Sequence, residues 1–475
     1  MAIVLVVPEP KDKYTSYGPP LGLCYISAYL KMKGVRDVSG VDLNIDSIDD
    51  LKKLLTGKEN NIVGIYCATK SFDESIAIAK IAKKNGSIVI MGGPHPTLCP
   101  EEILQNENVD FVVIGEGEIN FYKLVTALYD NKSFEELEGI GYKNSQGEMV
   151  VKYDNNFIKD LDSLPFPDRE LFDPDKYHSG AMTLMATRGC PYACKNCKPA
   201  LDLICGKYRI RSVENVLTEI KDVIIGKCHY NSLHFVDNDL TVHKKWITEF
   251  CNRIIEEDLK VTWGCQGGTK TLDKKLMTLM KNAGCINIGI GIESGSQRVI
   301  DEVIHKKIDL IDSKNVVDWA NEVGIGIHIW FMIGIPLETL DEMTETVDLA
   351  SSLNVTSIGF SIGTPWPKTG FYEICEKNDF FLTDKWGDYN EKRYCKIKTD
   401  DFSPEDVEKC RQKVFEVFIN KGWFVSKDDF VMYNPYYNNS YMGNVKIKLL
   451  MPIINLIGQE RAARIYNSFK AKVKM

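Results

Sequence analysis

The sequence predicts an α/β protein: a doubly wound N-terminal domain, a partial barrel of six strand–helix units, and a mainly helical C-terminal region. Short apolar segments alternate with segments of helical periodicity through the first 130 residues, and this alternation resumes near residue 181. At roughly 150 residues per domain, 475 residues also require more than one domain. We expect domains at residues 1–135 and 181–365, a linker at 136–180 and the helical region at 366–475.

Composition excludes several classes of protein. Apolar residues make up 44% and charged residues 26% of the chain, as in folded globular proteins. A net charge of −8 argues against a nucleic-acid-binding protein held by a large basic surface, so we expect no nucleic-acid partner. We find no signal peptide and no run of about 20 apolar residues. Most of the 14 cysteines lie singly in apolar runs, as reduced thiols do, and we therefore expect a cytoplasmic protein.

The first series of elements predicts a parallel sheet with helices on both faces. The expected strands are Ala2–Val7, Val38–Val41, Ile62–Tyr66, Ser87–Met91 and Asp110–Ile114, and the expected helices include Leu21–Lys33, Asp73–Lys84 and Pro100–Asn106. Ligands of such sheets bind outside the carboxyl ends of the strands. The candidate binding residues there are Thr69, Ser71, Gly92, Gly93, Gly115, Glu116 and Gly117.

The second series predicts the barrel, after a connector that contains a hairpin over Gly141–Lys152. The expected strands are Met182–Thr187, Ser232–Val236, Leu259–Cys265, Ile286–Ile292, Gly326–Ile333 and Thr356–Ser361. The expected helices are Val213–Ile225, Lys244–Glu256, Asp273–Asn282, Ser313–Glu322 and Leu340–Ser352. The active face of such a barrel lies at the carboxyl ends of its strands.

Three cysteines lie in a loop directly after the first strand of this second series. Cys190, Cys194 and Cys197 have the spacing C-x3-C-x2-C. A cuboidal iron–sulfur cluster normally takes four cysteine ligands, so three leave one iron open to a small molecule. Zinc is an alternative, with Cys205 as the fourth ligand, but zinc ribbons favour paired C-x2-C units and only one is present. Structural thiols do not explain three cysteines in a loop with Gly189 and Pro191. We therefore favour a [4Fe–4S] cluster.

This loop, at the start of a β/α barrel, resembles that of the radical S-adenosylmethionine (SAM) superfamily. The resemblance implies that the open iron binds the amino and carboxylate groups of SAM. One electron then cleaves SAM to a 5′-deoxyadenosyl radical, and the cofactors supply this chemistry. It further implies SAM contacts at strand ends, from Asp237, Asn238, Glu293, Ser294 and Gly334.

Some positions depart from the pattern of that superfamily or allow two readings. Asn196 stands where the family usually has an aromatic residue before the last cysteine, and Leu337 replaces the second glycine of the G-x-P-G-E-T turn. Arg209 and Arg211 match an R-x-R-S sequence of many relatives, but two solvated arginines explain them equally well.

The N-terminal domain resembles that of the cobalamin-binding radical SAM group, so that the resemblance covers roughly residues 1–400. The shared stretches are Pro19–Leu23, Gly92–Pro96 and Gly115–Glu118. The resemblance implies a Rossmann-like cobalamin domain in which the strand-end residues named above hold cobalamin. The D-x-H-x-x-G motif that supplies an axial histidine in other cobalamin proteins is absent, so we expect cobalamin without a histidine ligand, His95 included. The family also contains members whose N-terminal fold binds no cobalamin.

We therefore expect a radical SAM enzyme that abstracts hydrogen from an unactivated carbon and then transfers a methyl group from methylcobalamin. The alternative within the same architecture is C–C bond formation, cyclisation or oxidation without methyl transfer. A zinc-binding interaction protein is the alternative from another class. The expected partners are a small-molecule or lipid-like substrate and an electron donor of the flavodoxin or ferredoxin type.

The C-terminal segment Lys446–Met475 predicts a basic amphipathic helix. It carries seven Lys or Arg residues and one acid, and Ala462, Ile465, Tyr466 and Phe469 have the spacing of one helix face. Such a helix can lie on an anionic membrane surface, which would make the protein membrane-peripheral. The commoner arrangement, which we favour, packs the helix on the barrel with its lysines in solvent.

Overall fold

The computed structural model describes residues 2–9, 18–56, 61–154, 156–177, 180–383, 385–435 and 437. The chain forms two compact units, the first made of residues 1–266, 304–306 and 364–390 and the second of residues 267–303, 307–363 and 391–475. The predicted helix at Lys446–Met475 lies outside the described residues. Among the residues described, no helix is both long and apolar enough to cross a membrane.

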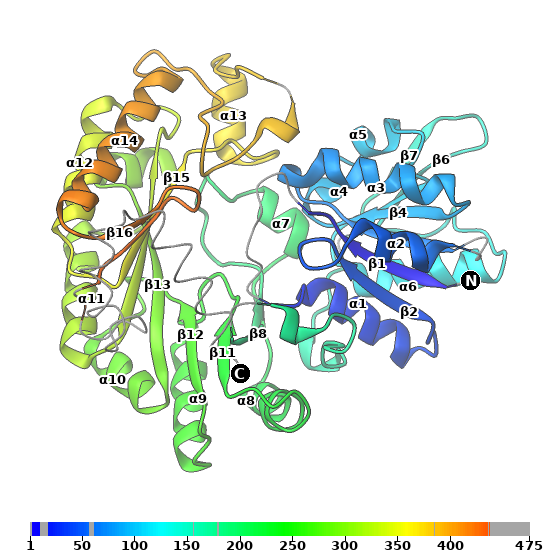
Figure 1. Cartoon of the computed structure of the whole chain (residues 1–475), viewed down its shortest axis with the longest axis horizontal. Coiled ribbons are helices and arrows are strands. Elements are labelled where there is room, and N and C mark those ends of the chain that lie inside the picture. The colour runs from blue at the N-terminus through cyan, green and yellow to red at the C-terminus, as the bar shows by residue number, and fades with distance from the viewer. Residues whose placement is uncertain are drawn as a thin grey trace. The chain divides into compact units, whose positions relative to one another are not determined.

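The N-terminal part of the first unit is a seven-stranded sheet in the order β2-β1-β3-β4-β5-β6-β7 (Figure 1). Its strands are β1 (Ile3–Val7), β2 (Val38–Asp42), β3 (Ile62–Tyr66), β4 (Ile88–Gly92), β5 (Phe111–Val113), β6 (Ile140–Lys143) and β7 (Met149–Lys152). The first five are parallel, and β6 and β7 form the predicted hairpin at the edge. The strands predicted for this sheet are all present, with ends that differ by at most one residue.

Helices cover both faces of this sheet. The face that bears Ile3 and Leu5 of β1 packs against α1 (Leu21–Met32) and α6 (Gly117–Tyr129). The opposite face, with Val4 and Val6, packs against α2 (Ile48–Leu55), α3 (Phe72–Lys84) and α5 (Pro100–Gln105). Alternate residues of a strand point to opposite faces, so a fully apolar strand such as β1 serves both cores. The domain is doubly wound, as predicted.

The strand order reverses between β1 and β3. In doubly wound sheets of this order, ligands bind in the crevice beside that reversal, at the carboxyl ends of the strands. The 3-10 turn Thr69–Ser71 directly follows β3 and therefore lies at this edge. The short helix α4 (Pro94–Leu98), which follows β4, starts at the same edge.

The first unit also contains the beginning of the second series. Strands β8 (Met182–Leu184), β11 (Ser232–Phe235) and β12 (Thr262–Gln266) are parallel neighbours. Helix α9 (Lys244–Glu256) follows β11, while the helix predicted over 213–225 is α8 (Val213–Thr218) continued by a π-helical segment. A small antiparallel ribbon of β9 (Thr187–Arg188) and β10 (Arg209–Ile210) encloses a loop that contains α7 (Ala200–Cys205). Residues 364–390 add α13 (Gly370–Lys377) to this unit.

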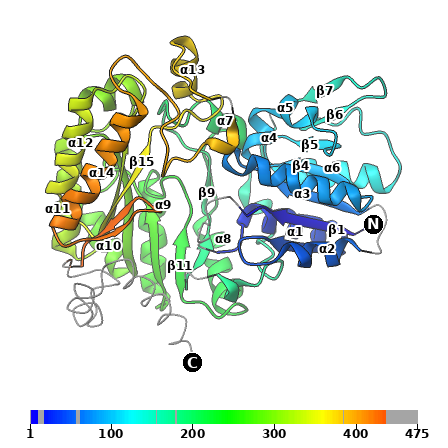
Figure 2. The same cartoon turned by 45° about the horizontal axis from the view of Figure 1, so that its top comes forward.

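The second unit continues the alternation with the parallel strands β13 (Cys285–Glu293), β14 (Gly326–Ile333) and β15 (Ser357–Ile362). Helices α10 (Lys274–Asn282), α11 (Leu310–Val323), α12 (Leu340–Ser352) and α14 (Pro404–Asn420) pack beside these strands (Figure 2). All six strands predicted for the barrel are thus present. The C-terminal region departs from the prediction, because β16 (Phe424–Ser426) and β17 (Val431–Tyr433) form an antiparallel pair that extends the sheet at β15.

Candidate functional site

The three predicted cluster cysteines lie in the loop between β9 and β10. Cys190 and Cys194 are half-buried and Cys197 is exposed, and none forms a disulfide. The backbone N–H groups of Cys197 and Lys198 donate to the carbonyl of Cys194 at 3.1 and 2.9 Å, which folds this part of the loop into a turn. Burial raises the pKa of the Cys190 thiol, while Lys198 and Lys306 oppose this shift by favouring the thiolate. Three free thiols between Cys190 and Cys197, partly open to solvent, fit an iron–sulfur cluster.

The base of this loop is tightly closed. Gly189 has a φ of 78°, and a Cβ atom there would lie 2.8 Å from the carbonyl oxygens of Gly206 and Lys207. Only glycine combines this left-handed conformation with so close an approach of two backbones. Position 189 therefore has no room for a side chain. The start of the cysteine loop at Gly189 lies directly against its end at Gly206 and Lys207.

A buried aspartate anchors the strand that leads into the loop. Asp237, which follows β11, accepts hydrogen bonds from the backbone N–H of Ala186 and from the N–H and hydroxyl of Thr187. Burial raises the pKa of Asp237 to about 6, and these hydrogen bonds limit the rise. The Nδ2 of Asn238 donates to the carbonyl of Gly189 at 3.4 Å. Asp237 and Asn238 thus both contact the segment 186–189 that leads into the cysteine loop. Their contact with SAM stays a prediction.

Asp239 is a residue of this region that the sequence-based site prediction did not include. Its carboxylate accepts from the Tyr192 hydroxyl at 3.1 Å and from the backbone and hydroxyl of Thr241. Burial raises the pKa of Asp239, and Lys306 opposes the rise. Tyr192 lies between the first two cysteines, so Asp239 holds the middle of the cysteine loop. The sequence signal was the polar strand end itself, which fitted a helix cap equally well.

The other predicted SAM-binding residues lie in the second unit, at the ends of β13 and β14. Glu293 ends β13 with a φ of 76°. Ser294 is fully buried, and its Oγ lies 3.2 Å from the Thr346 Oγ1. Gly334 directly follows β14, with a φ of 70°. The structure therefore brings all three to strand ends of one parallel sheet, and their role stays a prediction.

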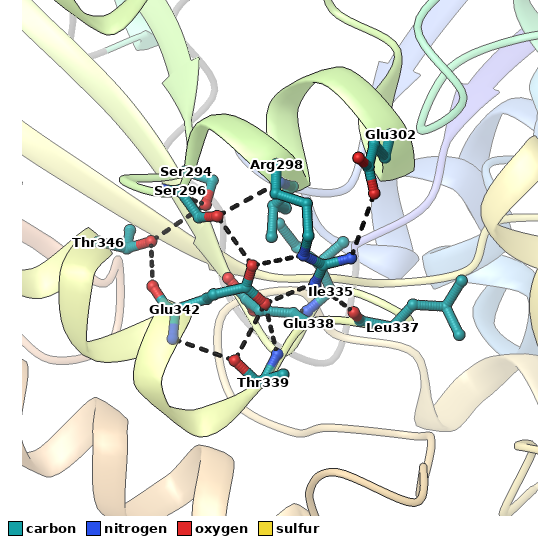
Figure 3. A network of polar contacts seen from close by, with 11 residues as sticks. Ser294, Ser296, Arg298, Glu302, Ile335, Leu337, Glu338, Thr339, Glu342 and Thr346 are labelled. Atoms are coloured by element: carbon teal, nitrogen blue, oxygen red, sulfur yellow. Dashed lines mark hydrogen bonds and ion pairs between the residues drawn. The ribbon is translucent and has the colours of Figure 1, made fainter.

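Figure 3 shows the polar network that fixes these two strand ends. Arg298 donates from Nε and Nη2 to the two carboxylate oxygens of Glu342, at 2.7 and 2.6 Å, and Ser296 Oγ donates to Glu342 Oε1 at 2.8 Å. Arg298 Nη2 also donates to the carbonyl of Leu337 at 2.9 Å. This bidentate pairing holds the pKa of Glu342 at about 2. The loop after β13 and the turn after β14 are thereby joined.

Glu338 braces the turn after β14 from inside. Its side chain is buried, its Oε2 accepts from the backbone N–H of Ile335 at 3.0 Å, and no hydrogen-bond partner of its Oε1 occurs among the described residues. Burial raises the pKa of Glu338 to about 8, which keeps most of it protonated at neutral pH. Leu337 has a φ of 68°, so it adopts the left-handed conformation that the family's glycine takes without strain.

The predicted cobalamin-binding residues gather at the carboxyl edge of the N-terminal sheet. Thr69 and Ser71 are buried in the turn after β3. Gly92 ends β4, and Gly93 has a φ of 107°. A Cβ at Gly93 would lie 3.0 Å from the Cys67 carbonyl oxygen, so two strand ends approach each other closely there. Small residues at converging strand ends fit a large ligand that needs close access to backbone.

His95 is enclosed beside these residues. Its side chain is fully buried, and its Nδ1 lies 3.1 Å from the Thr69 Oγ1. The rings of Phe72 and Trp386 pack edge-on against the imidazole, with centroids 5.1 and 5.5 Å away. Its other ring nitrogen, Nε2, lies 3.7 Å from the Glu102 Oε2. That His95 is not a cobalt ligand stays a prediction.

Gly115, Glu116 and Gly117 form the turn between β5 and α6. The backbone of this turn lies at the predicted cobalamin edge, whereas the Glu116 carboxylate contacts Arg188 and Arg209. Arg211 is 4% exposed and pairs with the buried Glu219 at 2.6 Å. The reading of Arg209 and Arg211 as solvated surface residues is therefore wrong, because both are held in buried ion pairs.

Comparisons with known proteins agree with this architecture. Residues 11–125 match the B12 binding domain family, and residues 184–350 match the radical SAM superfamily. An uncharacterized methyltransferase from Pyrococcus horikoshii is 31% identical over 446 residues, which cover 90% of this chain and 95% of the relative. An anaerobic magnesium-protoporphyrin IX monomethyl ester cyclase from Rubrivivax gelatinosus is 29% identical over 78% of this chain and 68% of its own length.

The fold is also similar to that of the radical SAM methyltransferase TsrM from Kitasatospora setae, solved with cobalamin and a [4Fe–4S] cluster. The TM-score is 0.70 at 16% identity, over 88% of this chain and 89% of TsrM. The chain belongs to the radical SAM superfamily, within the group that carries a B12-binding domain. The predicted family, α/β fold class and enzyme class are confirmed, as are SAM, an iron–sulfur cluster and cobalamin as cofactors. The predicted domain boundaries and individual site residues stay predictions.

Glu338 gives a pH dependence that can be measured. Because the folded protein holds its proton more tightly than the unfolded chain, Glu338 stabilises the fold fully below about pH 4.5, and this contribution is lost as the pH rises toward about 8. The unfolding free energy of the wild type should therefore fall, relative to Glu338→Gln, by on the order of 1 kcal/mol per pH unit over that window. Denaturant titrations from about pH 5 to 8 test this, with exposed Glu345→Gln as the control. A constant difference would contradict it.

Proposed function

We propose that this enzyme transfers a methyl group to an unactivated carbon atom of a small-molecule substrate. The observation that carries the proposal is the match to a methyltransferase-named relative over 90% of this chain and 95% of that relative. Such a match spans both the cysteine loop and the N-terminal domain.

In this reaction the chain binds, orients and shields reactive groups. When bound, the cluster and SAM supply a 5′-deoxyadenosyl radical, and cobalamin supplies a transferable methyl group. Cys190, Cys194 and Cys197 would hold the cluster, and the five strand-end residues described above would hold SAM. Thr69, Ser71 and the glycine-rich turns after β4 and β5 would hold cobalamin. Abstraction of a hydrogen atom needs no general base, so no acid–base pair is required of the protein.

A second reaction class remains open because a cyclase is among the relatives, at 29% identity. A radical SAM enzyme of this architecture can also form a C–C bond or a ring, or oxidise its substrate, without methyl transfer. Mass spectrometry distinguishes the two outcomes. Methyl transfer yields both 5′-deoxyadenosine and S-adenosylhomocysteine, because a second SAM must recharge the cobalamin, whereas the alternative yields no S-adenosylhomocysteine.

We further propose a cytoplasmic location and an electron donor of the flavodoxin or ferredoxin type. The cluster must receive one electron for each SAM cleaved, and the 14 cysteines form no disulfide in the structure, which suits a reducing compartment. A lipid-like substrate is one form of the proposal, and it would suit a basic C-terminal segment that contacts a membrane.

Replacement of Cys190, Cys194 and Cys197 by alanine together should abolish the brown chromophore and the cleavage of SAM, because no other thiol lies on the loop between Gly189 and Pro199. Iron and sulfide analysis after anaerobic reconstitution measures the loss. Cys228→Ala, which changes a thiol outside the loop, should retain full iron content. Full iron content in the triple variant would refute the assignment.

Cobalamin bound by the full chain should show no nitrogen coordination from His95, because the D-x-H-x-x-G motif is absent and the His95 Nδ1 contacts Thr69. Electron paramagnetic resonance of the cobalt(II) form should be the same for the wild type and His95→Gln. Loss of nitrogen hyperfine splitting in the variant would mean that His95 is a ligand after all. Failure of the wild type to retain cobalamin would favour the second reaction class.

The membrane proposal is tested by flotation with anionic vesicles. If Lys446–Met475 lies on a membrane, its seven basic residues, each worth about 1 kcal/mol at an anionic surface, should carry the full chain to the vesicle fraction. A chain that ends at residue 445 should stay behind, and 0.5 M salt should release the full chain. Equal and negligible flotation of both chains would remove the membrane reading and leave packing against the protein.

A further inference from the structure

Two arginines close the base of the cysteine loop. Arg188 on β9 and Arg209 on β10 are register partners in the antiparallel ribbon, and their side chains are only 9% and 11% exposed. The loop that bears the three cysteines leaves the ribbon at Arg188 and returns to it at Arg209. Two guanidinium groups held side by side away from water repel each other unless an anion lies between them. The ribbon therefore depends on its counter-ions.

Those counter-ions come from the turn between β5 and α6. Arg209 donates from Nη1 and Nη2 to the two carboxylate oxygens of Glu116, both at 3.0 Å, and Arg188 Nη1 donates to Glu116 Oε1 at 2.9 Å. Arg188 Nη2 donates to Glu118 Oε1 at 2.5 Å. Two carboxylates thus neutralise two guanidinium groups. The Arg209 contact is bidentate, the strongest form of this pairing.

The Glu116 side chain makes these contacts instead of capping its own helix. It is the N-cap residue of α6, yet its side chain makes no capping hydrogen bond. An acidic N-cap side chain ordinarily accepts from the backbone of its own helix. Here its remaining partner is the backbone N–H of Ile158, at 2.9 Å from Oε2. Arg188 and Arg209 hold the pKa of Glu116 below its ordinary value against burial, so the carboxylate stays charged.

Aromatic rings complete the enclosure. The Arg188 guanidinium lies over the ring of Tyr25, 5.2 Å from its centroid, and that of Arg209 lies over Phe157 at 5.5 Å. Tyr25 belongs to α1, so the arginines of the cysteine loop are embedded in the N-terminal domain. Loss of one carboxylate would leave a positive charge there without access to water.

We propose that Glu116 is a positioning residue that couples cobalamin binding to cluster binding: it joins the cobalamin edge of the sheet to the base of the cysteine loop. The inference rests on the proposed sites for the two cofactors. Cobalamin bound against Gly115 and Gly117 orders the Glu116 turn, and this turn orders the ribbon from which the cysteines project. Coupling between sites is reciprocal, so the cluster in turn strengthens cobalamin binding.

The test is an equilibrium measurement that needs no substrate. Hydroxocobalamin is titrated anaerobically into the full chain with its cluster reconstituted, and again after removal of the iron by chelation. The cluster should tighten cobalamin binding in the wild type by about fivefold or more, within the usual range of such couplings. In Glu116→Gln this ratio should fall to nearly one, measured on preparations whose iron and sulfide content matches that of the wild type. Exposed Glu101→Gln, in the same domain, should keep the wild-type ratio.

A second variant covers the case in which Glu116→Gln no longer binds cobalamin. Arg209→Gln keeps every residue of the sheet edge and removes the partner of Glu116 on the cysteine-loop side, so it should also bring the ratio close to one. A wild-type ratio in either binding-competent variant, or a ratio of one in the wild type, overturns the coupling. Failure of the wild type to bind cobalamin in both states would instead overturn the proposed cofactor site.

Discussion

Buried carboxylates hold the irregular segments on which this enzyme depends. Loops at the ends of parallel strands have few backbone partners, and a buried carboxylate can bind several donors at once. Asp237 anchors the entry to the cysteine loop, Asp239 its middle and Glu116 its base. In the second unit, Glu338 and Glu342 fix the turn that follows β14. Each of these acids joins segments that the sheet alone would leave independent.

The partners of each carboxylate decide its charge state. Glu342 meets a guanidinium in a bidentate pair, and its pKa lies near 2. Asp237 meets only neutral donors, and burial raises its pKa to about 6. Glu338 has fewer donors still and a pKa of about 8. Burial disfavours the charged form, and only donors or an opposite charge offset that cost. Glu342, in helix α12, is therefore an anion. Glu338, four residues earlier, is mostly protonated at neutral pH.

The features that sequence predicts here are those encoded locally. The apolar runs of β1, β3 and β14 and the spacing of the three cysteines are each visible within ten residues. Strands β16 and β17 were not predicted, because three residues each are too few to show alternation. Helix α2 was not predicted either, although Ser47 and Asp50 form a capping box at its start. A serine followed three residues later by an acid is a local signal for the start of a helix, so α2 was predictable from the sequence.

The ion pairs at the base of the cysteine loop could not be predicted from local sequence. Arg188 and Glu118 are separated by 70 residues, and Arg209 and Glu116 by 93. Their pairing follows from how the ribbon meets the sheet edge, which no local pattern encodes. A sequence shows two arginines and two glutamates, each of which fits a solvated surface. Only the folded chain shows that all four are buried together.

Perturbed pKa values usually mark acids and bases in catalysis. Here they have another origin, because hydrogen-atom abstraction requires no proton transfer by the protein. Burial raises the pKa values of Asp237 and Glu338, and the backbone N–H groups that donate to them offset only part of the rise. Leu337, adjacent to Glu338, is held in a strained left-handed conformation that a mobile turn would release. These buried carboxylates thus hold loops in place, and the cofactors supply the radical chemistry.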